Sequence, residues 1–190
     1  MPTWAIVTLI IAGVVLLLAI IIAGMYNSLV KLNERVNQAW AGIVNQLKRR
    51  ADLFKNLDEP IKAYAKHEKG LYENIAESRA KMMGARTVQS VAEADRSMLG
   101  TLSRIMAISE NYPDLKADEG FQKVMEEIRD TEDKITASRS FYNAGVEAIN
   151  SRIKVFPFNI LFHKFKERDY YEVDEATFAK LDEAPELKLS

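Results

Sequence analysis

The first twenty-five residues constrain this chain more than any other part of it. From Trp4 to Met25 the sequence reads WAIVTLIIAGVVLLLAIIIAGM, with no charged residue, no side-chain amide and no proline. As a helix this stretch would be about 33 Å long, which matches the roughly 30 Å hydrocarbon core of a bilayer. A cleaved secretory signal is the competing interpretation, but it would be shorter and would carry a charged n-region. We therefore predict a membrane-spanning helix, whose residues include Trp4, Ile11, Leu17, Ile22 and Met25.

The residues after this span are predominantly basic. Before Asp52 the only acid is Glu34, against five basic residues: Lys31, Arg35, Lys48, Arg49 and Arg50. The positive-inside rule places such a flank in the cytoplasm, so we predict that the N-terminus lies outside and the rest of the chain inside. Lys31 and Arg35 are the candidate contacts for anionic lipid head groups on this flank.

Steps of three and four between apolar residues predict amphipathic helices after the span. With no proline before Pro60, the membrane helix is expected to continue into a first soluble helix, on whose buried stripe we place Leu29, Leu32, Val36, Ala39, Trp40, Ile43, Leu47, Phe54 and Leu57. A second helix is predicted from Pro60 to a turn at Gly84, with a stripe of Ile61, Tyr64, Leu71, Tyr72, Ile75 and Met82.

Two more helices follow. The third is predicted to start near Thr87 or Ser90, since Ser90 and Glu93 have the spacing of a capping box, and to stop at Pro113. Its stripe is Val91, Leu99, Leu102, Ile105, Met106 and Tyr112. The fourth is predicted to start at Asp118 and to run for about 38 residues, with Gly145 tolerated where a neighbour packs closely. Its stripe is Phe121, Val124, Met125, Ile128, Ile135, Tyr142, Val146, Ile149, Ile153 and Phe156.

These patterns predict an all-α protein. The N-terminal transmembrane helix would continue into an elongated antiparallel four-helix bundle, followed by a short irregular C-terminal tail. The predicted domains are an anchor at 1–25, the helical bundle at 26–156, and a tail at 157–190 that packs on the bundle or on the membrane surface.

The start of this tail has two interpretations. Residues 155–168 read VFPFNILFHKFKER and combine apolar with basic side chains. We favour a segment that folds back and caps the bundle. The alternative is a second membrane contact, in which aromatic and aliphatic residues enter the head-group region and basic residues meet lipid phosphates. The apolar candidates are Phe156, Phe158, Leu161, Phe162 and Phe165, and the basic ones are Lys164, Lys166 and Arg168.

Charge is segregated along the chain after the span. Net charge alternates in sign from one segment to the next, from +5 in residues 31–86 to −5 in 87–135, then +4 in 136–168 and −5 in 169–190. Pairing of these segments within one molecule is the simpler interpretation. Pairing between neighbouring copies is the alternative, and it would fix their register.

The sequence contains no recognisable catalytic or metal-binding constellation. It has no cysteine and only two histidines, His67 and His163. A di-iron bundle needs Glu-x-x-His pairs, but Tyr64 and Ile160 stand three residues before these histidines. A glycine-rich phosphate loop is also missing. We predict no catalytic residue, no metal site and no cofactor, and the formal net charge of −1 gives no reason to expect a nucleic-acid partner.

Several stretches of the sequence carry a resemblance to a known family. They are Tyr26-Asn27 directly after the span, QLKRRADLFKNL at 46–57, YAKHE at 64–68, YPDLKADEGF at 112–121, TEDKITASRSFYNAGV at 131–146 and FPFN at 156–159. With these stretches in this order, the chain resembles the LemA family of bacterial membrane-anchored helical proteins. The resemblance implies an N-terminal span, a four-helix bundle, a place in the bacterial cytoplasmic membrane and no established catalytic activity. It supplies no functional site.

Two functions remain open. The first is a membrane-anchored scaffold, with the lipid bilayer and further copies of itself as partners, that forms a ring or larger homo-oligomer and organises or shapes the membrane. A rigid link between span and soluble helix favours this role, as do small residues that allow close helix approach in lipid: Ala12, Gly13, Ala19, Ala23 and Gly24. The alternative is a membrane-tethered binding or sensory module that docks another protein, for example a second membrane protein.

Overall fold

The computed structural model describes residues 2–62 and 70–172 of the chain. Within these residues all regular secondary structure is helical and no strand occurs, which confirms the all-α class. The elements are α1 (Thr3–Asn56), α2 (Asp58–Ile61), α3 (Leu71–Gly84), α4 (Val88–Asn111), α5 (Pro113–Ala117), α6 (Glu119–Lys154) and α7 (Phe158–Leu161).

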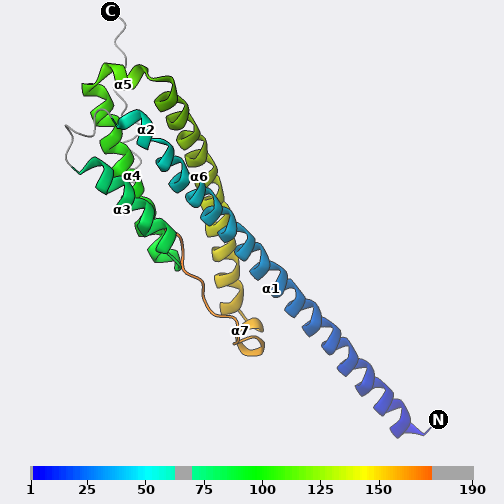
Figure 1. Ribbon diagram of the computed structural model, residues 1–190. Coiled ribbons are helices and arrows are strands. Elements are labelled where there is room, and N and C mark those ends of the chain that lie inside the picture. Colours follow the sequence, from blue (N-terminus) through cyan, green and yellow to red (C-terminus); the bar gives the residue numbers. More distant parts are fainter. Residues whose placement is uncertain (1, 63–69, 173–190) are drawn as a thin grey trace, which may run out of the picture.

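Helix α1 is uninterrupted over 54 residues, which corresponds to a length of about 81 Å. The predicted continuity of the apolar stretch with the first soluble helix is therefore confirmed. Its N-terminal half extends alone, away from all other helices (Figure 1). In the described part of the chain it is the one helix long and apolar enough to cross a membrane. The predicted boundary between residues 25 and 26 falls inside this helix.

The second half of α1 packs along α6, which runs beside it in the opposite direction (Figure 1). Burial begins at Leu29 and follows one face of α1, in steps of seven, four and three residues, through Val36, Ile43, Leu47, Arg50 and Phe54. The predicted close approach at Gly145 is confirmed, because a Cβ atom added there would lie 2.9 Å from a methyl carbon of Val36.

Helices α3 and α4 form a hairpin that packs on α1 chiefly through α3. The second helix begins later than predicted, at Leu71, after the short α2 that contains Pro60. Tyr72 was expected on the buried face but is exposed, because its neighbour Leu71 occupies the core position and consecutive residues point about 100° apart on a helix. Tyr64, placed on the same stripe, lies outside the described residues.

Capping side chains define where α4 and α6 begin. Thr87 caps α4, where its hydroxyl accepts a hydrogen bond from the Ser90 backbone N–H at 3.1 Å and the Ser90 hydroxyl accepts one from the Thr87 N–H at 2.9 Å. The capping box is therefore Thr87 with Ser90, one turn earlier than the predicted pair of Ser90 with Glu93. The predicted start of the last long helix is confirmed, since Asp118 caps α6 by accepting from the Phe121 N–H at 2.8 Å.

The C-terminal end of α6 lies beside α1 just after the apolar stretch (Figure 1). The helix ends at Lys154, so Phe156 does not continue the buried stripe as predicted but is 77% exposed. Val155 is already extended, and the residue before Pro157 is disfavoured in the helical conformation. Residues 155–165 form a compact segment around α7, called here the α7 turn, and residues 166–172 form an extended strap that returns along the helices.

Candidate functional site

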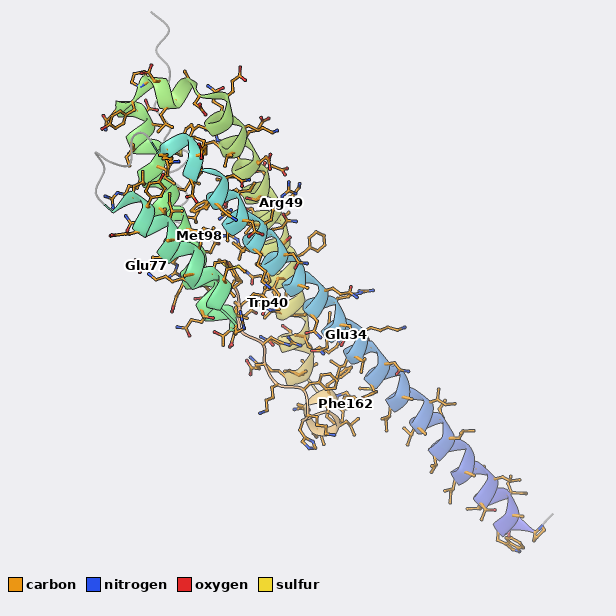
Figure 2. The ribbon with its side chains drawn as sticks, in the orientation of Figure 1. Glu34, Trp40, Arg49, Glu77, Met98 and Phe162 are labelled. Atoms are coloured by element: carbon orange, nitrogen blue, oxygen red, sulfur yellow. The ribbon has the colours of Figure 1, made fainter. Side chains whose placement is uncertain are left out.

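The predicted membrane-span residues are open to the surroundings. Trp4, Ile11, Leu17 and Ile22 are exposed and Met25 is half-buried. Side chains project from all sides of this half of α1, with no other element beside them (Figure 2). This half of α1 is long and apolar enough to cross a membrane, and an exposed apolar surface of this extent is typical of a membrane-contacting segment.

The predicted basic head-group contacts separate into two sets. Lys31, Arg35, Lys164 and Lys166 are exposed. Arg168 is half-buried and points into the protein, where one of its terminal nitrogens donates to the side-chain oxygens of Asn33 and Asn37, both at 2.7 Å. These hydrogen bonds hold the strap against α1.

The aromatic residues of the α7 turn also separate into two sets. Phe158, Phe162 and Phe165 are half-buried. The rings of Phe162 and Phe165 pack on Tyr26, with centroids 5.9 and 6.1 Å from that of the tyrosine. Phe162 lies in the turn below the end of α6 (Figure 2). Phe156 and Leu161 instead remain exposed.

A charged cluster lies buried at the centre of the soluble part. The guanidinium of Arg50 on α1 is completely buried and donates to Asp95 on α4 at 2.8 Å, to Thr131 on α6 at 3.4 Å and to Glu132 on α6. Tyr171 of the strap donates its hydroxyl proton to the second oxygen of Asp95 at 2.9 Å. This cluster therefore connects three long helices and the strap.

Burial of the cluster shifts two of its ionisable groups. Desolvation raises the pKa of the Asp95 carboxyl, and it does so against the opposing effect of Arg50. Desolvation and the neighbouring Asp95 carboxylate raise the pKa of the Tyr171 phenol well above its ordinary value. Arg50, Asp95 and Tyr171 are buried, so we interpret these shifts as a consequence of packing rather than of catalysis.

Two asparagines on α6 hold the backbone of the strap. Asn150 accepts from the Arg168 N–H at 2.8 Å and donates to its carbonyl oxygen at 2.9 Å. Asn143 makes the same pair of bonds with Tyr171, at 2.9 and 3.0 Å. Residues seven apart face the same side of a helix, so the two amides fix the strap at two points on one face of α6.

Trp40 also contacts the strap. The centre of its ring lies 5.5 Å from that of Tyr142 on α6 and 6.3 Å from that of Tyr171 in the strap. The half-buried position of Trp40 is consistent with its predicted place on the buried stripe of the first soluble helix. Figure 2 shows it between the helices, well away from the apolar half of α1.

A shallow groove on the surface of the soluble part lies between α1 and α6, and no residue of α3 or α4 lines it. Phe141 also lines this groove and is 77% exposed, although it stands on a helix whose other large apolar side chains are mostly buried. Most of the remaining lining residues are small: Ala39, Gly42, Ala137, Ser138, Ala144, Gly145 and Ala148. The others are the polar or charged residues Arg35, Gln38, Gln46 and Lys134 and the apolar Leu32. We call it the α1–α6 groove.

Ion pairs between the oppositely charged segments occur within the chain. Arg50 pairs with Asp95 and with Glu132, which joins the basic segment 31–86 to the acidic segment 87–135. A group of three or more potential metal ligands does not occur among residues 2–62 and 70–172. His163 is exposed in the α7 turn, and His67 lies outside the described residues.

Fold and surface together define a class: a helical, membrane-associated protein in which one apolar helix carries a soluble helical domain. Residues 39–188 match the LemA family, and the chain belongs to that family. It is similar to the magnetosome proteins MamQ 1 and MamQ 2 of Paramagnetospirillum magneticum, at 23% identity over 90% of this chain and 73% of theirs. It is also similar to the magnetosome protein MamQ of Magnetospirillum gryphiswaldense, at 24% identity over 77% of this chain and 64% of that protein.

Sequence reasoning did not find the buried cluster. Arg50 was counted among the basic residues next to the span, whereas the structure removes it from the surface. A signal was available, because Arg50 falls on the buried stripe between Leu47 and Phe54 at helical spacing. No pattern in the sequence indicates that Tyr171 contacts Asp95, because this contact depends on where the strap lies.

Proposed function

We propose that this protein is a membrane-anchored structural protein that self-associates into a ring or larger homo-oligomer and organises or shapes the membrane. The observation that carries the proposal is the α1–α6 groove with its exposed Phe141. A continuous α1 supports it, because a rigid helix transmits the arrangement of the soluble domains directly to the anchors.

The groove has the features of a helix-packing surface. The small alanine side chains of the groove leave room for another helix to approach, whereas Gly145 and Gly42 already serve the contact between α1 and α6. Phe141 supplies a large apolar side chain on the same face. A second copy of the chain can therefore provide the projecting ring while it accepts one in its own groove, so that both apolar surfaces leave water.

A second contact between copies is proposed in the membrane. The apolar half of α1 has a shallow concave strip lined by Thr8, Ala12 and Ala19, together with Ile11, Val15 and Leu16. Small side chains at this strip favour packing of neighbouring anchors in lipid. A reciprocal groove contact alone closes at two copies, so an assembly of more than two copies needs this second contact between anchors.

Topology and bundle arrangement belong to the same proposal. We place the soluble part in the cytoplasm of a bacterium, with the protein in the inner membrane. Although Arg50 is buried, Lys31, Arg35, Lys48 and Arg49 of the basic flank are exposed, and the positive-inside rule places such a flank in the cytoplasm.

We interpret the four long helices α1, α3, α4 and α6 as an antiparallel bundle, and we propose a role without catalysis.

Imaging of the full-length protein in native lipid tests this function. Electron microscopy is expected to show uniform particles of several copies whose anchors share one lipid patch. Phe141→Glu should reduce the copy number measured by mass photometry, because a charge cannot enter the groove without loss of hydration. The matched control is Met83→Glu, an exposed apolar residue on α3, which should leave the copy number unchanged.

Single bundles in separate lipid discs would overturn the scaffold. The same groove then favours the alternative function, a membrane-tethered module that docks a helix of a partner protein. Crosslinking from a benzoylphenylalanine residue at position 141 would distinguish the two, because it captures a second copy in the first case and a different protein in the second.

A further inference from the structure

The α7 turn lies at the height of the membrane boundary. Phe162 and Phe165 pack on Tyr26, which is one residue past the predicted span. Arg152, near the end of α6, donates to the Ser28 hydroxyl at 2.8 Å, and its guanidinium lies 5.8 Å from the centre of the Phe158 ring. Since a helix rises about 1.5 Å per residue, contacts to residues 26 and 28 fix the turn within about 5 Å of the end of the span.

Four of the seven large apolar side chains in the turn are exposed, and one of them is Val155 at 54%. Phe156 is 77% exposed, Ile160 is 66% exposed and Leu161 is 41% exposed. Phe158, Phe162 and Phe165 are the inward set, and their packing on one another and on Tyr26 makes the turn a supported structure. The capping interpretation of this segment therefore accounts for the inward residues alone.

Lysines accompany the outward apolar side chains. Lys164 lies within the turn and Lys166 follows it directly, and both are exposed. Apolar side chains next to lysines are typical of segments that lie in the head-group region, where the apolar groups enter the acyl boundary and the amines meet lipid phosphates. The anchor next to the turn brings a bilayer to this place, which decides in favour of lipid over a protein partner.

We propose that the α7 turn is a second membrane contact, in which Phe156, Ile160 and Leu161 enter the head-group region of an anionic bilayer and Lys164 and Lys166 lie at its phosphates. Together with the anchor, this contact attaches the protein to the membrane at two points. Two points of attachment fix the tilt of the soluble part relative to the bilayer. The proposal rests on the membrane anchor within the proposed function, but not on self-association.

Lipid quenching of a fluorophore tests this contact, and the chain is well suited to it because it contains no cysteine. Single cysteines are introduced at Phe156→Cys, Leu17→Cys and Phe141→Cys in the full-length protein. Each is labelled with the fluorophore NBD and reconstituted in vesicles of phosphatidylcholine and phosphatidylglycerol. Nitroxide lipids then carry the quencher either at the head group or at mid-chain. Phe141 is the matched control, because it is as exposed as Phe156 but lies on the soluble part of α6.

Position 156 is expected to be quenched most by head-group nitroxide and position 17 most by mid-chain nitroxide, while position 141 is quenched by neither. Burial of position 141 between copies would shift its emission to the blue without lipid quenching, so self-association does not imitate the result. Lys164→Glu with Lys166→Glu should reduce quenching at position 156 in the anionic vesicles, because the added acids are repelled by the lipid phosphates.

Two outcomes would overturn the inference. If position 17 is quenched while position 156 is no more quenched than position 141, the anchor stands and the second contact is wrong. If position 17 is not quenched either, the anchor itself fails, and the inference fails with it.

Discussion

The two halves of α1 share one helix axis but have opposite surroundings. In the first half, from Thr3 to Met25, apolar side chains cover every face and none is buried by another element. In the second half a single stripe is buried, polar residues occupy the other faces, and a charged residue, Arg50, lies in the core. The difference shows that the environment, and not the helical geometry, decides which side chains a helix can carry. Lipid accepts an all-apolar surface, whereas a protein core accepts a charged side chain only when that side chain has partners.

The largest expected effect comes from removing the buried charge. Arg50→Met leaves Asp95 and Glu132 without their common partner, and breaking a buried ion pair in this way costs about 3–5 kcal/mol. Urea unfolding of the full-length protein in detergent micelles, followed by helical circular dichroism, measures the loss. Lys48→Met is the control, because this exposed neighbour should change stability by no more than about 0.5 kcal/mol. Equal effects of the two substitutions would contradict the cluster.

A charge in the other half of α1 should act on insertion instead of folding. Leu17→Lys places a charge near mid-bilayer, at a cost of about 2.5–3.5 kcal/mol on the insertion scale. The fraction of protein recovered in membranes should fall, while the unfolding transition of the soluble part in detergent stays the same. A lower unfolding midpoint would break the comparison, since it would mean that the first half of α1 contributes to the soluble core.

The hydroxyl of Tyr171 is expected to contribute next. Tyr171→Phe removes a hydrogen bond to the Asp95 carboxylate, for which about 1.5–3 kcal/mol is typical. Urea unfolding near pH 8 measures this difference, and Tyr170→Phe in the same strap serves as the exposed control.

This difference should depend on pH in one direction. The raised pKa keeps the folded Tyr171 protonated, whereas in the unfolded chain it ionises above pH about 10. Above that pH, ionisation of the unfolded tyrosine lowers the free energy of unfolding of the wild type by about 1.4 kcal/mol for each further pH unit. The phenylalanine variant has no group that ionises at this position, so its free energy of unfolding lacks this contribution. The stability advantage of the wild type is therefore full below pH about 10 and shrinks above it. A constant advantage up to pH 11 would argue against a buried phenol.

A methyl group at the contact between α1 and α6 gives the smallest effect. Gly145→Ala should destabilise by about 1–3 kcal/mol, because the new Cβ lies 2.9 Å from a methyl of Val36, a β-branched residue with little freedom to move. Gly100→Ala on α4 meets no atom within 4 Å and should instead stabilise by about 0.5–1 kcal/mol through helix propensity. Thermal unfolding of both variants measures these changes in stability. If Gly145→Ala stabilises the protein, α1 and α6 lie further apart at this contact than the structure shows.

Local patterns in the sequence were sufficient to predict several elements of the fold. The start of α6 at Asp118, the end of α4 before Pro113 and the close approach at Gly145 all depend on capping, proline sterics or the missing Cβ. Helix ends without such a signal were predicted less well. Extending the fourth stripe to Phe156 was wrong because the chain becomes extended before Pro157.

Taken by itself, the sequence determined that residues 4–25 form an apolar helix, that the regular secondary structure of the described residues is helical, and that the family is LemA. These results follow from composition, from periodicity and from motifs that are local in the chain. The tertiary structure alone decided that Arg50 meets Asp95, Glu132 and, through Asp95, the hydroxyl of Tyr171, and that the aromatic residues of the α7 turn divide between Tyr26 and the surface. These contacts join residues 45 or more positions apart. They depend on where helices cross and where the strap returns, and periodicity records which face of a helix is buried but not against which residue.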